Sequence, residues 1–132
     1  MKICIKTVLF FALFLISCSK EPVGNWDNNI RLSMKNAVLS AAGDSLSIKT
    51  GGNGWWIEAV ELKKQAVWYM NPMLMDSIHY SINLDSVLVE HSDKTTLVIK
   101  ADKNNSKVER QIDILLEDGD YFDYVTITQK GQ

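Results

Sequence analysis

Alternation of apolar and polar residues dominates this 132-residue chain from residue 37 onward. Successive side chains of a β-strand point to opposite faces, so a period of two is typical of a strand with one buried face. The alternating stretches cover residues 37–39, 45–49, 55–60, 78–84, 87–90, 97–101 and 112–116, and Val125 and Ile127 form a last one.

Turn-forming residues separate these stretches. Gly43-Asp44, the run Gly51-Gly52-Asn53-Gly54 and residues 102–107 are polar or glycine-rich, and Asp118-Gly119 is a pair typical of tight hairpins. No long segment keeps a helical period, and a helical turn is expected only within residues 58–69. The sequence therefore predicts an all-β fold, an antiparallel β-sandwich of about seven to eight strands.

The first 17 residues have the features of a secretory signal. Lys2 and Lys6 precede the apolar run of residues 8–16, which is shorter than the roughly 20 residues needed to span a bilayer. The run ends in Leu15-Ile16-Ser17-Cys18, which resembles the lipobox of bacterial lipoproteins. This resemblance implies that a diacylglyceryl group attaches to the Cys18 thiol, that cleavage occurs before Cys18, and that its new amino group is acylated.

We therefore expect three parts in the chain: a signal peptide (1–17), a lipidated tether (18–35) and a β-sandwich domain (36–132). Two or more acyl chains hold a protein stably on a membrane, so the membrane is an expected partner. In lipoproteins, an aspartate directly after the lipidated cysteine favours retention at the inner membrane. Ser19 occupies that position here, so we expect the outer membrane, on either its surface or its periplasmic side. A plain cleavable signal with an incidental cysteine is the alternative.

The charge balance makes nucleic acid an unlikely partner. The chain has 14 basic and 16 acidic residues, a net charge of −2, and loss of Lys2 and Lys6 makes the mature chain more acidic. Such a surface does not attract phosphate backbones. The second cysteine, Cys4, lies in the signal segment, so Cys18 is the one thiol expected in the mature protein.

The last third of the chain resembles the end of a BACON domain. The resemblance is carried by Leu97–Asn104, by Arg110 at the start of the next alternating stretch, and by Val125-Thr126-Ile127-Thr128-Gln129-Lys130-Gly131. Residues 41–48 and Trp55-Trp56-Ile57 resemble earlier parts of the family, whereas residues 61–93 are longer than its pattern. The resemblance implies an immunoglobulin-like sandwich from Bacteroidota, with a carbohydrate- or mucin-related role.

No catalytic or metal-binding motif is present. His79 and His91 are the two histidines, the acidic turn of residues 117–123 lacks a known calcium-loop spacing, and there is no G-x-S-x-G sequence. Nothing in the sequence singles out a carboxylate pair for glycoside hydrolysis. We therefore expect no catalytic residue, no metal and no cofactor, and a protein that is not an enzyme.

Aromatic residues are the candidates for ligand binding. Trp55 alternates with Ile57 and Ala59 and is expected in the core, whereas Trp56 lies on the opposite face with Glu58. Trp56, Trp68 and Tyr69 are the predicted ligand-binding residues. They suit a non-catalytic binding or accessory module at the cell envelope, related to carbohydrate or mucin by the resemblance.

The apolar run of residues 66–75 supports an alternative. It contains Pro72, which a central strand disfavours, and three of the five methionines of the chain. It is either a loop folded over the end of the sandwich or an exposed patch. As an exposed patch, residues 68–75 would dock another envelope protein, and the chain would then be a structural or assembly component.

Overall fold

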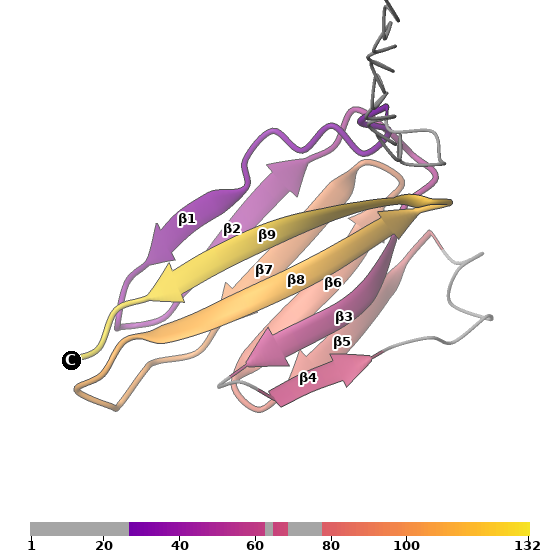
Figure 1. The fold of residues 1–132 in the computed structure, drawn as a ribbon. Coiled ribbons are helices and arrows are strands. Elements are labelled where there is room, and N and C mark those ends of the chain that lie inside the picture. The colour runs from indigo at the N-terminus through magenta and orange to yellow at the C-terminus, as the bar shows by residue number, and fades with distance from the viewer. Residues whose placement is uncertain (1–26, 63–64, 69–77) are drawn as a thin grey trace, which may run out of the picture.

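This computed structural model describes residues 27–62, 65–68 and 78–132 of the chain (Figure 1). These residues contain nine β-strands and no helix. The strands are β1 (Asn36–Leu39), β2 (Asp44–Lys49), β3 (Trp56–Leu62), β4 (Gln65–Trp68), β5 (Tyr80–Leu84), β6 (Val87–Asp93), β7 (Thr96–Ala101), β8 (Arg110–Asp118) and β9 (Tyr121–Gln129).

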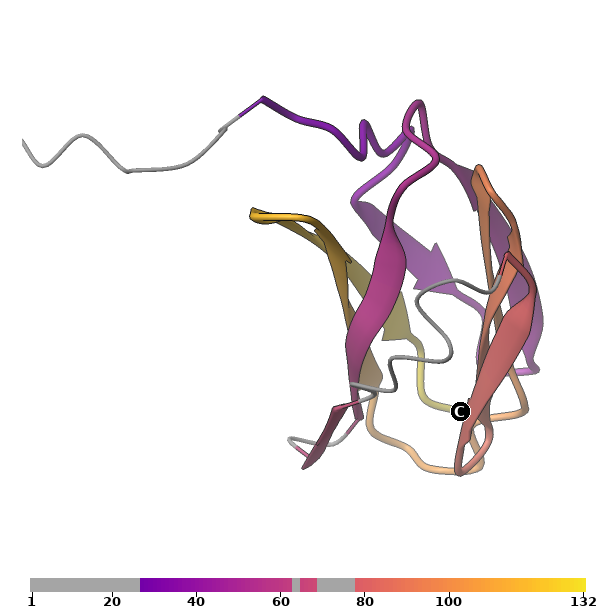
Figure 2. The same cartoon turned by 90° about the vertical axis from the view of Figure 1, so that its right-hand side faces the viewer.

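The strands form two sheets packed face to face. The five-stranded sheet has the order β1-β9-β8-β3-β4 and lies in front in Figure 1, and the four-stranded sheet has the order β2-β7-β6-β5 and lies behind. Figure 2 shows the two layers from the side. β1 pairs with β9 in parallel, and all other described pairs are antiparallel.

This arrangement confirms the predicted β-sandwich. β3, β8 and β9 take the places of strands C, F and G of an immunoglobulin-like sandwich, and β2, β7 and β6 those of B, E and D. Each alternating stretch of the sequence overlaps a strand, although residue 55 and residues 78–79 precede the strands in which their stretches continue. The helical turn expected within residues 58–69 is wrong, because β3 and the short β4 pair there as a hairpin. The four residues of β4 are too few to show a period of two.

The inner faces of both sheets form one apolar core. Its fully buried members come from β2, β3, β6, β7, β8 and β9 and include Ile48, Val60, Val89, Leu97, Ile99, Ile112, Ile114, Leu116, Val125 and Ile127. Truncating one such side chain to alanine typically lowers the free energy of unfolding by about 2–5 kcal/mol.

The packed structure begins before the domain boundary at residue 36 that the sequence favours. Ile30 is fully buried in the core, and Leu32 forms an isolated bridge with Thr50. The Gly51 and Gly52 amides donate hydrogen bonds to the Ile30 carbonyl, each at 3.1 Å. The segment of residues 30–35, expected as tether, is therefore part of the folded domain.

An aromatic cluster closes the core near the start of β3. The His91 ring lies 4.1 Å from the Trp55 ring and 5.2 Å from the Tyr80 ring, centroid to centroid. The Ile57 amide donates a 2.9 Å hydrogen bond to the Tyr80 hydroxyl, and burial raises the pKa of Tyr80. Trp55 is 3% exposed, which confirms its predicted place in the core.

A polar clamp closes the opposite end of the sandwich. The fully buried Gln129 amide donates to the Ser40 carbonyl at 2.9 Å and to the Asp102 carbonyl at 3.0 Å. Its oxygen accepts a 2.7 Å hydrogen bond from Arg110 Nε. One side chain thus connects β9 to the residues that follow β1 and β7 and to the start of β8.

We expect Gln129→Ala to lower the free energy of unfolding by about 2–3 kcal/mol, because buried hydrogen-bonding partners lose their bonds. The matched control is Gln111→Ala on β8, where the glutamine is exposed and bonds only Asp113. We expect the control to change stability by less than about 0.5 kcal/mol. Urea unfolding of both variants measures the difference, and equal losses would contradict the clamp.

Candidate functional site

The outer face of the five-stranded sheet brings aromatic and acidic residues together in rows. Residues directly opposite one another on paired strands share a face. The pairs Trp56↔Glu117 and Glu117↔Phe122 make one row across β3, β8 and β9. The next row consists of Ala59, Leu115 and Tyr124. We call the surface of these two rows and Glu58 the aromatic face.

The two aromatic side chains of β9 are open to solvent on this face. Phe122 is 48% exposed and Tyr124 is 58% exposed, while Trp56 is half-buried. They point outward because the alternate positions Val125 and Ile127 are fully buried in the core. Strands β3, β8 and β9 lie side by side in Figure 1, and the tip of the β8–β9 hairpin bends away from the four-stranded sheet in Figure 2.

A β-bulge adds a buried carboxyl group to the aromatic face. The β3–β8 register shifts between Ile57 and Ala59, so Glu58 has no directly opposite residue. Glu58 is 7% exposed, and Trp56 Nε1 donates to its Oε2 at 3.1 Å. The shift also places Ala59 opposite Leu115, so the prediction that Ala59 shares a face with Trp55 and Ile57 is wrong, and Ala59 is buried at 5% exposure within the outward row.

Glu58 and Glu117 form a carboxyl pair. Burial is the largest cause that raises the pKa of Glu117, followed by the negative charge of Glu58, a hydrogen bond with Glu58, and the charge of Asp120. Glu117 therefore holds its proton more tightly than an isolated glutamate does.

Register and hydrogen bonding place the two carboxyl groups near each other: Glu58 accepts a hydrogen bond from Trp56, and Glu117 lies opposite Trp56 on β8. That the chain lacks catalytic residues stays a prediction.

Among the residues that the structure describes, no lysine or arginine lies on the aromatic face or in the next row. Glu61 pairs with Asp113 in that row, and Asp113 accepts hydrogen bonds from Thr126 Oγ1 at 2.7 Å and Gln111 Nε2 at 2.6 Å. The outward positions of β3, β8 and β9 thus carry four carboxyl groups and no cation: Glu58, Glu61, Asp113 and Glu117.

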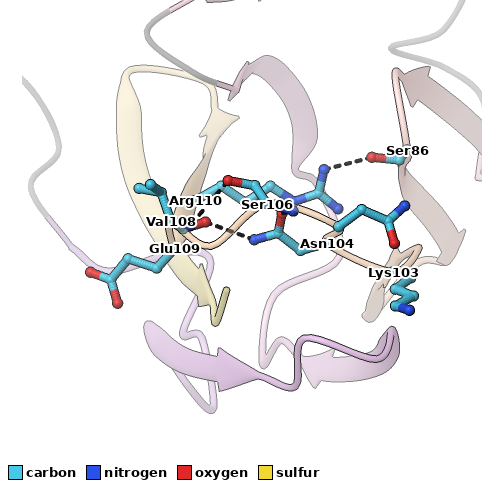
Figure 3. A pocket seen from close by; sticks show the side chains of 8 residues that line it. Ser86, Lys103, Asn104, Ser106, Val108, Glu109 and Arg110 are labelled. Carbon is cyan, nitrogen blue, oxygen red and sulfur yellow. Dashed lines mark hydrogen bonds between the residues drawn. The ribbon is translucent and has the colours of Figure 1, made fainter. Parts of the chain in front are cut away.

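A polar pocket of about 410 Å³ lies at the clamped end of the sandwich (Figure 3). Arg110 projects into it but is held by Ser86 Oγ at 2.5 Å and by the Asp102 carbonyl at 3.1 Å, besides Gln129. The buried Asn104 donates to the carbonyls of Val108 and Lys130. These side chains hold loops in place, so the pocket offers a ligand few unused donors.

The structure describes two of the sequence-predicted site residues. Trp56 lies on the aromatic face, and Trp68 of β4 pairs with Ala59, at the end of the second row. Tyr69, the remaining residues of the apolar run up to residue 75, and Cys18 lie outside the described residues. Trp68 is described by its backbone position alone.

Sequence reasoning missed Phe122 and Tyr124. The alternation that placed Val125 and Ile127 inward assigns Tyr124 to the outer face, so the signal was present for this residue. Adjacency to Trp56 was not readable, because it depends on the pairing of β8 with both β3 and β9.

Metal and membrane features are absent from the described parts of the chain. Within residues 27–62, 65–68 and 78–132, no three His, Cys, Asp or Glu residues are grouped to hold a metal ion. Over the same ranges, no helix has the length and apolar character needed to cross a bilayer.

Comparison with known proteins finds structural but no sequence relatives. No protein family and no curated protein sequence matches the chain. A Bacteroides thetaiotaomicron protein with an NMR structure is similar, with a TM-score of 0.65, 17% identity, and coverage of 85% of this chain and 94% of its own. This likeness shows the fold alone.

Two enzymes are similar over small parts of their own chains. One is a Bacteroides ovatus GH5 xyloglucanase in complex with a heptasaccharide, with a TM-score of 0.45, 15% identity, and coverage of 74% of this chain and 17% of that one. The other is an endo-fucoidan hydrolase of glycoside hydrolase family 107, with a TM-score of 0.47, 10% identity, and coverage of 83% and 14%.

We expect Glu117→Gln to remove a pH dependence of stability. Because the folded-state pKa of Glu117 is raised, its contribution to stability is complete below the ordinary glutamate pKa and is lost as pH rises through the raised value. The variant should therefore gain stability relative to the natural chain as pH rises from acid to neutral.

Thermal unfolding across that pH range measures the effect. The matched control is Glu109→Gln, which removes the same charge from an exposed residue in the loop before β8. A stability difference that is constant with pH, or the same for both variants, would contradict a raised pKa of Glu117 in the folded protein.

Proposed function

We propose that this chain is a lipid-anchored protein of the cell envelope that binds carbohydrate, without catalysis, through the aromatic face. The observation that carries the proposal is the exposure of Phe122 and Tyr124 on the same face of the five-stranded sheet as Trp56, with Glu117 of β8 between them. Isolated exposed apolar residues are ordinary, but adjacent aromatic rings on a sheet face form a patch that suits contact with a ligand.

The chemistry of this face fits sugars better than a wholly apolar partner. Sugar rings present C–H groups that pack on aromatic rings, and their hydroxyl groups donate hydrogen bonds. Tyr124 and Phe122 supply rings with few rotatable bonds, and the carboxyl groups of Glu58 and Glu117 supply acceptors beside them. Apolar contact and oriented polar groups are the two components of most small-molecule sites.

The anchoring part of the proposal is supported by the N-terminal sequence. The charged start, the apolar run of residues 8–16 and the cysteine after Ser17 occur in the order that lipoprotein processing requires. Acylation at Cys18 would keep the domain at the outer membrane, facing either the surface or the periplasm. A glycan of that compartment would then be within reach.

Kinship with BACON domains is also part of the proposal, and the residues that carry the resemblance have structural roles. Val125, Ile127 and Gln129 are fully buried. A Cβ on Gly131 would come within 2.6 Å of the Lys107 carbonyl, so the chain fits there only with glycine. A shared motif of this kind supports a shared fold and does not by itself specify a ligand.

We expect Phe122→Ala and Tyr124→Ala each to weaken glycan binding by about tenfold or more, since each removes a contact ring. The detergent-purified lipoprotein is first screened on a glycan array, and affinities for the retained glycans are measured by calorimetry. Val108→Ala is the control, because Val108 is 69% exposed but lies in the loop at the clamped end. Unchanged binding by both ring variants would contradict the site.

We expect Cys18→Ala to move the protein out of the membrane fraction, because the acyl chains lose their attachment point. Cys4→Ala is the matched control and should leave the mature protein membrane-bound. Mass spectrometry of the purified protein should show an acylated Cys18 as its first residue. An intact leader or an unmodified first residue would contradict anchoring.

A further inference from the structure

We infer that the aromatic face selects saccharides that carry a free, protonated amine. This inference rests on the proposed function and names the class of its ligand. It follows from the charge of the face, from the contact between Trp56 and Glu58, and from the carboxyl pair. A sugar ammonium group is the occupant whose charge complements this surface.

The charge of the face is uncompensated by the described chain. Glu58 is almost fully buried and accepts a hydrogen bond from Trp56, and Glu117 is half-buried beside it. No lysine or arginine of the described residues forms an ion pair with either carboxyl group. Burial, and after it the negative charge of Glu58, raises the pKa of Glu117, so ionising this side chain without a nearby cation is costly.

An ammonium group would favour the ionised form of Glu117. When it binds beside Glu58 and Glu117, the proton held by Glu117 leaves to solvent, and the Glu117 carboxylate then faces a positive charge. The neighbouring indole of Trp56 favours the same occupant, because tryptophan is the strongest aromatic partner of a cation. Phe122 and Tyr124 would contact the apolar C–H surface of the sugar ring.

The same arrangement disfavours acidic sugars. A uronate, sulfate or sialate carboxylate would approach Glu58, Glu117 and the neighbouring Glu61–Asp113 pair, with no lysine or arginine at the outward positions of β3 and β8 to pair with it. Like-charge contact of this kind is a repulsive element that separates ligands of equal size. An N-acetyl group removes the positive charge and with it the attraction.

Three oligosaccharides of equal length test the inference. Fully deacetylated chitosan hexasaccharide, its fully N-acetylated counterpart and an oligogalacturonate are titrated into the detergent-purified lipoprotein at mildly acidic pH. We expect the deacetylated ligand to bind at least about tenfold more tightly than the N-acetylated one, and the galacturonate to bind most weakly. The preference should shrink at high salt.

Variants of the carboxyl pair separate charge recognition from general sugar binding. Glu117→Gln should reduce the preference for the amine to about twofold or less, with Glu58→Gln as a second variant. Phe122→Ala should weaken both chitosan and chitin binding while leaving their ratio unchanged. Glu109→Gln, an equal change of net charge far from the face, should alter neither affinity nor ratio.

The outcomes distinguish this inference from the proposed function. Equal binding of the N-acetylated ligand, tighter binding of the galacturonate, or retention only of other neutral glycans would overturn the amine preference and leave carbohydrate binding intact. A preference that survives Glu117→Gln and Glu58→Gln would also overturn it. Failure to bind any glycan on the array would overturn the proposed function itself.

Discussion

The register of the β8–β9 hairpin is the constraint on which both the core and the candidate site depend. Its nine paired positions run from Arg110↔Gln129 to Asp118↔Tyr121, and Gly119 closes the turn with a φ of 62°. A slip by one residue would turn Val125 and Ile127 outward and Phe122 and Tyr124 inward. Burial of the apolar face therefore sets the register, and the register in turn determines which residues lie on the aromatic face.

The bulge at Glu58 changes the chemistry of that face without changing the fold. A regular strand would alternate strictly after Ile57. The extra residue instead leaves Glu58 beside Trp56 and Glu117 and still returns Val60 to the core. Bulges are common where a strand re-aims a side chain near a functional site. Two neighbouring acids with no cation beside them among the described residues are an unfavourable arrangement, which is why we connect them with a ligand rather than with stability.

The two ends of the sandwich serve different purposes. At the clamped end, Arg110, Gln129 and Asn104 use their donors on backbone carbonyls and on one another. Near the hairpin tip, Phe122 and Tyr124 are exposed and lie outside the core. The residues on which we base the proposed kinship therefore stabilise the fold, while other residues make up the proposed binding face.

The sequence by itself determined the class of fold, the positions of eight strands, the turn at Asp118-Gly119 and the burial of Trp55. Each of these depends on local alternation or on the chemistry of a local turn. It also singled out Trp56. It could not reveal the fifth strand of the larger sheet, since β4 is recognisable only through its pairing with β3. Nor could the sequence show that Trp56, Glu58 and Glu117 share a face with Phe122 and Tyr124. That arrangement depends on the pairing of β3 with β8, which are far apart in the sequence, and on the bulge within β3. Both are decided by how the two sheets pack together.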